Sequence, residues 1–383
     1  MAGRLASTTL ARTQGRWRPI PSRRVFAAVA AAAAAVAALG SPPVAAAKAP
    51  RRFAGVNFTF YPAISSATAE QMARAGVRSV VFGLSWPAIE GAPGSYDWSA
   101  SDQTVGDLAA AGIEPDPVLY GTPRWALDGP IATDTNANRV PPTRTPRARA
   151  SWAAFVQAAV ARYGTNGAYW QGPYQSQHPG AAPRPVHVWQ PWSEANLATY
   201  YWPAPRVKSY AKLVKISHDA IVGTDRSARI AVGGLVCEAE YGCAKYLRGF
   251  YRQPGVKGDF DLVALHPYAP TVGSVLHGIR GARRAMKRAH DARTKVWVNE
   301  IGWGSAPNDH HLNKGPKGQA RLLRSSFRHL ARSRRRLRIW RVDWFDWRDP
   351  QTAQSGCSWC FSAGLLDAGG KPKPSFKAFK RVS

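Results

Sequence analysis

Two glutamates stand in similar surroundings, far apart in the chain. Glu194 ends the run Val-Trp-Gln-Pro-Trp-Ser-Glu, and Glu300 ends the run Val-Trp-Val-Asn-Glu. A carboxylate beside tryptophan is costly to bury unless it is paired or solvated, so a lone glutamate there is usually a surface residue or a cap. Two such groups suit glycoside hydrolysis, because one protonates the leaving oxygen and the other attacks the anomeric carbon or activates water. We therefore interpret Glu194 and Glu300 as a catalytic pair.

The segments that must position this pair alternate between strand-like and helix-like patterns. Apolar runs that are rich in Val, Ile and aromatic residues predict eight strands: Phe53–Phe58, Val77–Trp86, Ile113–Tyr120, Val186–Ser193, Arg229–Leu235, Phe260–Tyr268, Lys295–Glu300 and Arg341–Trp347. Apolar spacing of three and four predicts eight helices: Ala67–Ala75, Asp102–Ala111, Arg147–Tyr163, Val207–Val222, Ala244–Tyr251, Val275–Ala289, Gln319–Leu337 and Ser375–Arg381. Gly76, Gly112, Gly164 and Gly223 follow four of these helices as expected stops.

Eight βα units in one uninterrupted stretch predict a closed (β/α)8 barrel that forms a single domain over residues 48–383. An open, doubly wound sheet is the alternative. Such a sheet usually has a Gly-rich loop after its first strand, whereas Phe58 is followed by Thr-Phe-Tyr-Pro. In a barrel of this type the chemistry lies where strands end and βα loops begin, and the fourth and seventh predicted strands end at the two glutamates.

The segment 192–196, Trp-Ser-Glu-Ala-Asn, is similar to the Trp-Asn-Glu-Pro-Asn pattern of clan A glycoside hydrolases. The segment 298–303, Val-Asn-Glu-Ile-Gly-Trp, resembles the strand that carries the nucleophile in that clan. The likeness runs from about Phe53 to the C-terminus and is nearest to bacterial relatives of glycoside hydrolase families 39 and 5. It implies that Glu194 is the acid/base, that Glu300 is the nucleophile and that the mechanism is retaining.

Other segments support the same resemblance and supply candidates for sugar binding. They are residues 86–98, 117–125, 266–268 and 363–374. Tyr268 is a candidate hydrogen-bond donor to the nucleophile, His266 a candidate contact to a sugar hydroxyl, and Asn196 a residue that shapes the turn after Glu194. The candidate substrate-binding residues are Ser193, Asn196, His266, Tyr268, Trp86, Trp125, Trp303 and Trp347, the four tryptophans as stacking platforms.

The sequence departs from the clan pattern at two positions. Ser193 stands where the clan usually has an asparagine that contacts the sugar 2-hydroxyl, and a serine has a shorter reach. Val81 stands where relatives often carry an arginine near the nucleophile, and such a cation would help to keep Glu300 ionised. These departures favour an alternative function, a catalytically weakened carbohydrate-binding barrel of the cell envelope.

Residues 1–47 have the features of an export signal. Arg23 and Arg24 precede an apolar run from Val25 to Leu39, which is short for a membrane span, and the segment 45–47, Ala-Ala-Ala, offers a cleavage site. The paired arginines resemble a twin-arginine signal. An uncleaved anchor is the alternative, and both place the domain outside the cytoplasmic membrane. The four cysteines, Cys237, Cys243, Cys357 and Cys360, fit an oxidising compartment; two local disulfides are expected, although other pairings and a zinc site remain open.

The formal net charge is +29. Such a charge favours anionic surroundings, so an acidic glycan or an anionic polymer of the cell envelope is a candidate partner. The densest basic run is Arg328, Arg332, Arg334, Arg335, Arg336, Arg338 and Arg341, which is interpreted as a solvated helix face or, alternatively, as a polymer-docking patch. Little else in the sequence resembles a nucleic-acid-binding module. The nine histidines show no metal-ligand spacing, so no metal or cofactor is expected.

Overall fold

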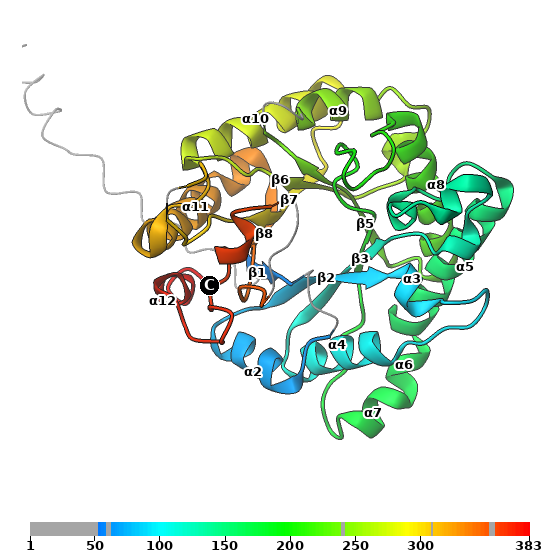
Figure 1. Ribbon diagram of the computed structural model, residues 1–383, viewed down its shortest axis with the longest axis horizontal. Coiled ribbons are helices and arrows are strands. Elements are labelled where there is room, and N and C mark those ends of the chain that lie inside the picture. Colours follow the sequence, from blue (N-terminus) through cyan, green and yellow to red (C-terminus); the bar gives the residue numbers. More distant parts are fainter. Residues whose placement is uncertain (1–52, 59–62, 239–241, 308, 352–356) are drawn as a thin grey trace, which may run out of the picture. The chain divides into compact units, whose positions relative to one another are not determined.

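The computed structural model describes residues 53–58, 63–238, 242–307, 309–351 and 357–383. Eight parallel strands close into a barrel in chain order, and helices surround it (Figure 1). The strands are β1 (Ala54–Asn57), β2 (Ser79–Ser85), β3 (Glu114–Tyr120), β4 (Val188–Pro191), β5 (Arg229–Val236), β6 (Leu262–His266), β7 (Lys295–Ile301) and β8 (Ile339–Trp344). The predicted (β/α)8 barrel is confirmed, whereas the predicted signal at 1–47 lies outside the described residues.

Each predicted helix has a counterpart in the structure. These are α2 (Ser66–Arg74), α4 (Ser99–Ala110), α5 (Pro146–Tyr163), α8 (Val207–Thr224), α9 (Cys243–Phe250), α10 (Val272–Arg288), α11 (Gly315–Leu337) and α12 (Pro374–Phe379). Thr145 and Thr271 cap α5 and α10, because each side chain accepts a hydrogen bond from the first helical turn. The short helices α3 (Trp86–Ile89), α6 (Ala168–Gln171) and α7 (Pro173–Gln177) were not predicted.

The prediction that four glycines end helices is only partly correct. Gly76 and Gly112 adopt the left-handed backbone, with φ of 91° and 78°, and they follow α2 and α4 as predicted. Gly164 follows α5 but has an ordinary φ of −66°, and Gly223 lies inside α8. Helix α8 continues for one residue past this glycine and ends at Thr224.

Side chains that alternate along the strands fill the barrel interior. Val81, Val118, Val188, Ala231, Leu262, Ala264 and Trp297 form one buried cluster that is separate from the main core. The neighbours Val80 and Phe82 belong to the main core instead, because successive side chains of a strand point to opposite faces. The interior is therefore a packed core, and the strand ends form a firm platform for the site.

Arg341 differs from its predicted surroundings. It lies in β8, as the predicted strand Arg341–Trp347 implied, but it was also counted in a basic run interpreted as solvated, and it is only 3% exposed. Its guanidinium is bonded to Asp116 and Glu114 on β3. Glu114 is the first residue of its strand, so this ion cluster lies toward the end of the barrel opposite the two catalytic candidates.

Two disulfides are present, Cys237–Cys243 and Cys357–Cys360, so the prediction of two local pairs is confirmed. Within the described ranges, no helix combines the length and the apolar character that crossing a bilayer would require.

Candidate active site

A sharp turn after β4 positions Glu194. The strand ends at Pro191, and both Trp192 and Glu194 adopt positive φ angles, 70° and 49°. Such angles are uncommon for residues other than glycine and often occur at functional sites, where surrounding contacts hold them. Here the Trp192 amide donates to Leu119 and the Glu194 amide donates to Gly234, which ties the turn to β3 and β5. The turn thus presents the Glu194 side chain at the C-terminal end of the barrel.

Strand β7 carries Glu300, and two neutral donors hold its carboxylate. The Asn57 side chain, at the end of β1, donates to Glu300 Oε1 at 3.0 Å. The Tyr268 hydroxyl, just beyond β6, donates to Glu300 Oε2 at 2.6 Å. Hydrogen bonds to the charged form of a carboxylate favour ionisation, so both donors favour a negatively charged Glu300.

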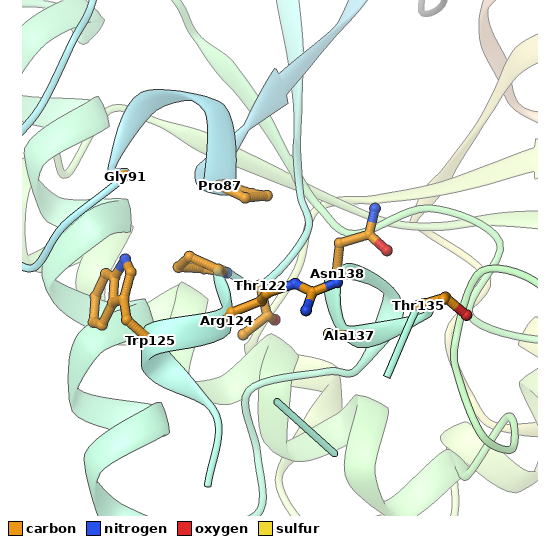
Figure 2. A pocket seen from close by; sticks show the side chains of 9 residues that line it. Pro87, Gly91, Thr122, Arg124, Trp125, Thr135, Ala137 and Asn138 are labelled. Atoms are coloured by element: carbon orange, nitrogen blue, oxygen red, sulfur yellow. The ribbon is translucent and has the colours of Figure 1, made fainter. Parts of the chain in front are cut away.

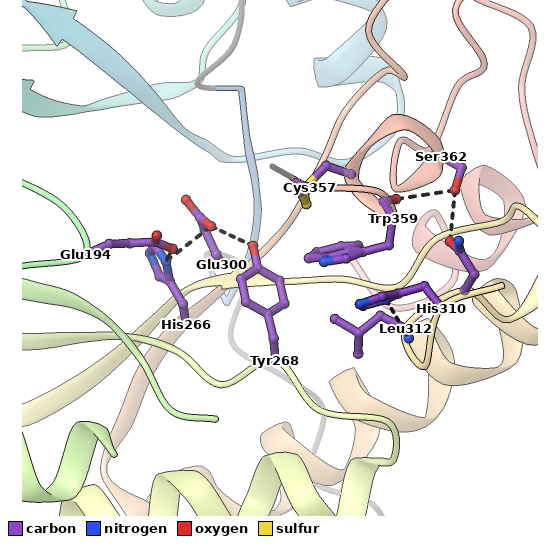
Figure 3. The surroundings of a disulfide bond; sticks show 11 residues. Glu194, His266, Tyr268, Glu300, His310, Leu312, Cys357, Trp359 and Ser362 are labelled. Carbon is purple, nitrogen blue, oxygen red and sulfur yellow. Dashed lines mark hydrogen bonds and ion pairs between the residues drawn. A yellow bond between two sulfur atoms is a disulfide. The ribbon is translucent and has the colours of Figure 1, made fainter. Parts of the chain in front are cut away.

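His266, the last residue of β6, lies between the two carboxylates (Figure 3). Its Nδ1 lies 2.7 Å from Glu194 Oε1 and 3.2 Å from Glu300 Oε2. An oxygen of each glutamate and a ring nitrogen of His266 all lie within 4.8 Å of one another. Glu194 and Glu300, 106 positions apart in the sequence, are therefore neighbours in the structure.

The two carboxyl groups have different pKa values. Burial, together with the nearby charge of Glu238, raises the pKa of Glu194 to about 8. Burial and the charge of Glu194 raise the pKa of Glu300, and His266, Tyr268 and Asn57 oppose the rise, so that this pKa is about 7. Glu194 is therefore the carboxyl group that keeps its proton more readily, and Glu300 is the one that loses it more readily.

His266 is suited to stay neutral, because burial lowers its pKa although the charge of Glu300 opposes this effect. With Nδ1 facing two carboxylate oxygens, the tautomer that protonates Nδ1 satisfies them best. Its Nε2 is buried and has no hydrogen-bond partner within the described part of the chain. The Glu–His–Glu group also supplies three atoms that could hold a metal ion. Such an ion would displace the hydrogen bond between His266 Nδ1 and Glu194, and it would take the place of the imidazole beside Glu300.

Several polar residues of the site escaped the sequence analysis. Asn57 is fully buried beside Glu300. Asn299 donates to Gln190 Oε1 at 2.9 Å, which links the ends of β7 and β4. Burial and the charges of Glu194 and Glu300 raise the pKa of Tyr200. Polar residues inside otherwise apolar strands were a usable signal for Asn57, Gln190 and Asn299, whereas the loop residue Tyr200 gave none.

The residues beside Glu194 have unequal roles. Ser193 is half-buried. Its hydroxyl and Nε2 of His266 both lie close to Gly234, so that a side chain at this glycine would crowd them. Asn196, predicted to bind substrate as well as to shape the turn, is 5% exposed. Its side-chain NH2 group donates to the Val236 carbonyl at 2.9 Å, and its Oδ1 accepts from the Val236 amide at 3.2 Å. Asn196 therefore fastens the β4 turn to β5 and has no free group for a sugar.

Three of the four predicted tryptophan platforms are unavailable. Trp86 and Trp303 are fully buried and Trp347 is 1% exposed, so protein covers both ring faces. Trp86 packs against Trp152, a residue of α5. These three predictions are corrected: the rings belong to the core.

Trp125 remains accessible. It is half-buried and lines a pocket of about 610 Å³ beyond the ends of β2 and β3, with Pro87, Thr122 and Arg124 (Figure 2). Its indole nitrogen donates to the Glu90 carbonyl at 2.9 Å, which fixes the ring. Trp125 is thus the one predicted platform with open ring surface in the structure.

Trp359 is an aromatic neighbour that the sequence analysis did not select. Its ring lies 4.8 Å from the ring of Tyr268, and the two planes are inclined by 64°. The Cys357–Cys360 disulfide closes the short loop that carries this tryptophan, and the ring lies beside Tyr268 (Figure 3).

Comparisons with known structures agree with this architecture. The chain is similar in fold to a family 39 glycoside hydrolase from the gut symbiont Bacteroides cellulosilyticus WH2, with a TM-score of 0.63 and 21% identity over 87% of this chain and 63% of that one. It thus spans less than two thirds of that protein. A monomeric β-xylosidase from Caulobacter crescentus CB15 gives a TM-score of 0.58 and 19% identity over 87% of this chain and 68% of the other.

A GH5_18 protein from Streptomyces cattleya, solved in complex with GlcNAc, gives a TM-score of 0.61 and 14% identity over 88% of this chain and 80% of the other. No protein-family model matches the sequence, and none of the curated proteins matches it. The fold is therefore the (β/α)8 barrel shared by these family 39 and family 5 glycoside hydrolases, and the resemblance found in the sequence extends to the structure.

Proposed function

We propose that this chain is a retaining glycoside hydrolase that cleaves O-glycosidic bonds of an oligo- or polysaccharide. The observation that carries the proposal is the pairing of Glu194 with Glu300 around His266, with oxygens within 4.8 Å of each other. Retaining enzymes hold their two carboxyl groups about 5–5.5 Å apart, whereas inverting enzymes leave about 6.5–9.5 Å for a water molecule. One oxygen of each glutamate lies within 4.8 Å of the other, and this close approach supports the retaining arrangement, in which one group attacks directly.

Glu300 acts as the nucleophile and Glu194 as the acid/base. Glu194, with the higher pKa, gives its proton to the leaving oxygen while the ionised Glu300 bonds to the anomeric carbon. The ionised Glu194 then takes a proton from water, and the resulting hydroxide displaces Glu300 from the sugar. The two displacements regenerate both groups and restore the original anomeric configuration.

The neighbouring residues bind and orient. Asn57 and Tyr268 hold the Glu300 carboxylate in place, and His266 keeps it close to Glu194. Trp125 offers the apolar ring on which a sugar face stacks. Ser193, half-buried beside Glu194, supplies one hydrogen bond to a substrate hydroxyl. The reaction needs neither a metal nor a cofactor.

The sequence and the disulfides fit action outside the cytoplasm. We propose that residues 1–47 direct export and that residues 48–383 form the secreted or envelope-associated catalytic domain. Two disulfides persist in an oxidising compartment, which supports this location.

The test is hydrolysis of a panel of aryl glycosides by the wild type, Glu300→Gln and Glu194→Gln. The panel includes xylosides, mannosides, glucosides and uronides, and every assay is repeated with a chelator. Glu300→Gln should lose activity on every substrate. Glu194→Gln should keep measurable glycosylation only on substrates with good leaving groups, because their departure needs no proton. Glu70→Gln, the same change on the exposed face of α2, is the matched control.

The stereochemistry of the first product is the second readout. Proton NMR should show the anomer with the configuration of the substrate. An inverted first product, full activity in Glu300→Gln, or activity that the chelator abolishes would each contradict the proposed mechanism.

A carbohydrate-binding barrel with little turnover is the second candidate function. It is favoured by Ser193 in place of asparagine and by Val81 in place of arginine. Val81 lies in the packed interior, and within the described residues His266 is the only potential cation that contacts Glu300. Retarded migration in gels that contain a polysaccharide, without hydrolysis of any substrate in the panel, would support this candidate.

A further inference from the structure

Helices α10, α11 and α12 form a continuous basic surface on the outside of the barrel. They follow one another around it, with α11 between the other two (Figure 1). Helix α10 has five Lys or Arg residues, α11 has eight and α12 has one, and none of the three has an acidic residue. We call the exposed side of these helices the basic face.

The cations of α11 lie along one line. Lys317, Arg321, Arg324, Arg328, Arg332 and Arg335 follow one another at intervals of three or four residues, which places them on one side of the helix. All are exposed except Arg324, which is half-buried, while Leu323, Phe327 and Leu330 cover the core on the opposite side. With a rise of about 1.5 Å per residue, this α11 stripe runs for about 27 Å.

The stripe has no acidic partner among the described residues. None of its six cations takes part there in an ion pair or a side-chain hydrogen bond. Some cations on other helices do have such partners: Arg74 of α2 pairs with Glu70, Arg162 of α5 with Asp102, and Lys215 of α8 with Asp219. A row of like charges without acids is unfavourable by itself, so an external polyanion would relieve the repulsion.

We propose that the basic face binds a linear, carboxylate-bearing polysaccharide. Guanidinium groups bind carboxylates in a bidentate manner, and successive cations 4.5–6 Å apart along the helix suit a repeating charged chain. Helices of a (β/α)8 barrel run opposite to the strands, so Lys317 lies toward the catalytic end and Arg335 toward the other. The choice of a glycan as the bound polymer rests on the proposed function, whereas the presence of the basic face does not depend on that function.

Binding is tested on the full chain carrying Glu300→Gln, so that no polymer is cut. The probe is polygalacturonate, and its methyl-esterified form of equal length is the neutral comparison. The variant Arg321→Gln/Arg328→Gln/Arg332→Gln/Arg335→Gln removes four stripe charges. Its matched control, Lys208→Gln/Lys212→Gln/Lys245→Gln/Arg248→Gln, removes four exposed charges from α8 and α9. Thermal melting confirms that both variants fold.

We expect salt-sensitive binding to polygalacturonate and about tenfold or more weaker binding in the stripe variant, with the control close to the parent. Equal loss in both variants would overturn the site, because only total charge would then matter. Equal binding of the esterified polymer would overturn its electrostatic basis. Tighter binding to single-stranded DNA or to phosphatidylglycerol vesicles would overturn the assignment to a polysaccharide. Failure here leaves the glycosidase assays untouched, and failure of those assays leaves the binding measurement valid.

Discussion

Replacing Tyr268 with phenylalanine tests how the site controls the charge of Glu300. The Tyr268 hydroxyl donates to Glu300 Oε2 at 2.6 Å, and it is one of the causes that lower the pKa of this glutamate. A hydrogen bond to a charged group contributes about 1.5–3 kcal/mol, which corresponds to about 1–2 pKa units. The variant should therefore raise the pKa of Glu300 from about 7 to a value at or above that of Glu194, which is about 8.

The consequence is a quantitative loss of the active protonation state. The proposed reaction needs Glu300 ionised and Glu194 protonated, so the fraction of competent enzyme depends on both pKa values. If the pKa of Glu300 rises by about 1.5 units, the competent fraction falls about 15-fold at pH 7. At the variant's own optimum pH, the fraction is about fivefold lower than that of the wild type at the wild-type optimum. The acidic limb of the kcat/KM profile moves to higher pH. Once the pKa of Glu300 passes that of Glu194, the alkaline limb rises as well, because the higher of the two pKa values then sets it.

The assay is the pH dependence of kcat/KM on the best aryl glycoside of the panel. Tyr201→Phe is the matched control, because Tyr201 is also buried and its hydroxyl donates to Ser209 at 2.8 Å, away from the two glutamates. It should lose stability without a displaced acidic limb. An unchanged acidic limb in Tyr268→Phe, or an equal displacement in the control, would refute the reasoning.

Three further predictions concern residues that hold the site or the barrel. Asn57→Ala removes a 3.0 Å bond to Glu300 and should raise the acidic limb of the pH profile by about one unit; an unchanged limb would count against this role. Asn196→Ala leaves two backbone groups of Val236 unpaired and should cost about 1–3 kcal/mol in urea unfolding, with the limbs of the profile unmoved. Arg341→Met leaves the carboxylates on β3 without their buried partner and should cost about 3–5 kcal/mol, and a stable variant would show that they are neutral in the fold.

The sequence predicted the barrel and the central residues of the site because both depend on strand positions. Once eight βα units are recognised, the ends of β4, β6 and β7 must meet at one rim. Glu194 and Glu300, together with His266 and Tyr268, follow from this topology alone. Their precise partners do not, because Asn57 reaches Glu300 only when β1 closes the barrel beside β8.

The tryptophans show where sequence reasoning stopped. A tryptophan at a strand end suits a sugar platform and a core equally well, and the choice depends on what packs over it. Trp86 is covered by Phe155 from α5, whereas Trp125 keeps an open side. Trp359 lies beside Tyr268 through a disulfide-bonded loop that follows β8. Contacts with segments distant in the sequence or with loops decide these positions, and no local pattern encodes them.

The two carboxyl groups differ mainly in the number of donors around them. Within the described residues no Lys or Arg contacts either group, so neutral donors and one imidazole must set their charge. Glu300 accepts bonds from Asn57 and Tyr268 and lies near His266, whereas Glu194 has His266 alone. The two neutral donors therefore lower the pKa of Glu300 and favour its ionisation over that of Glu194. Removing both donors should raise the pKa of Glu300 more than removing either one, and should favour ionisation of the proposed acid/base over that of the proposed nucleophile.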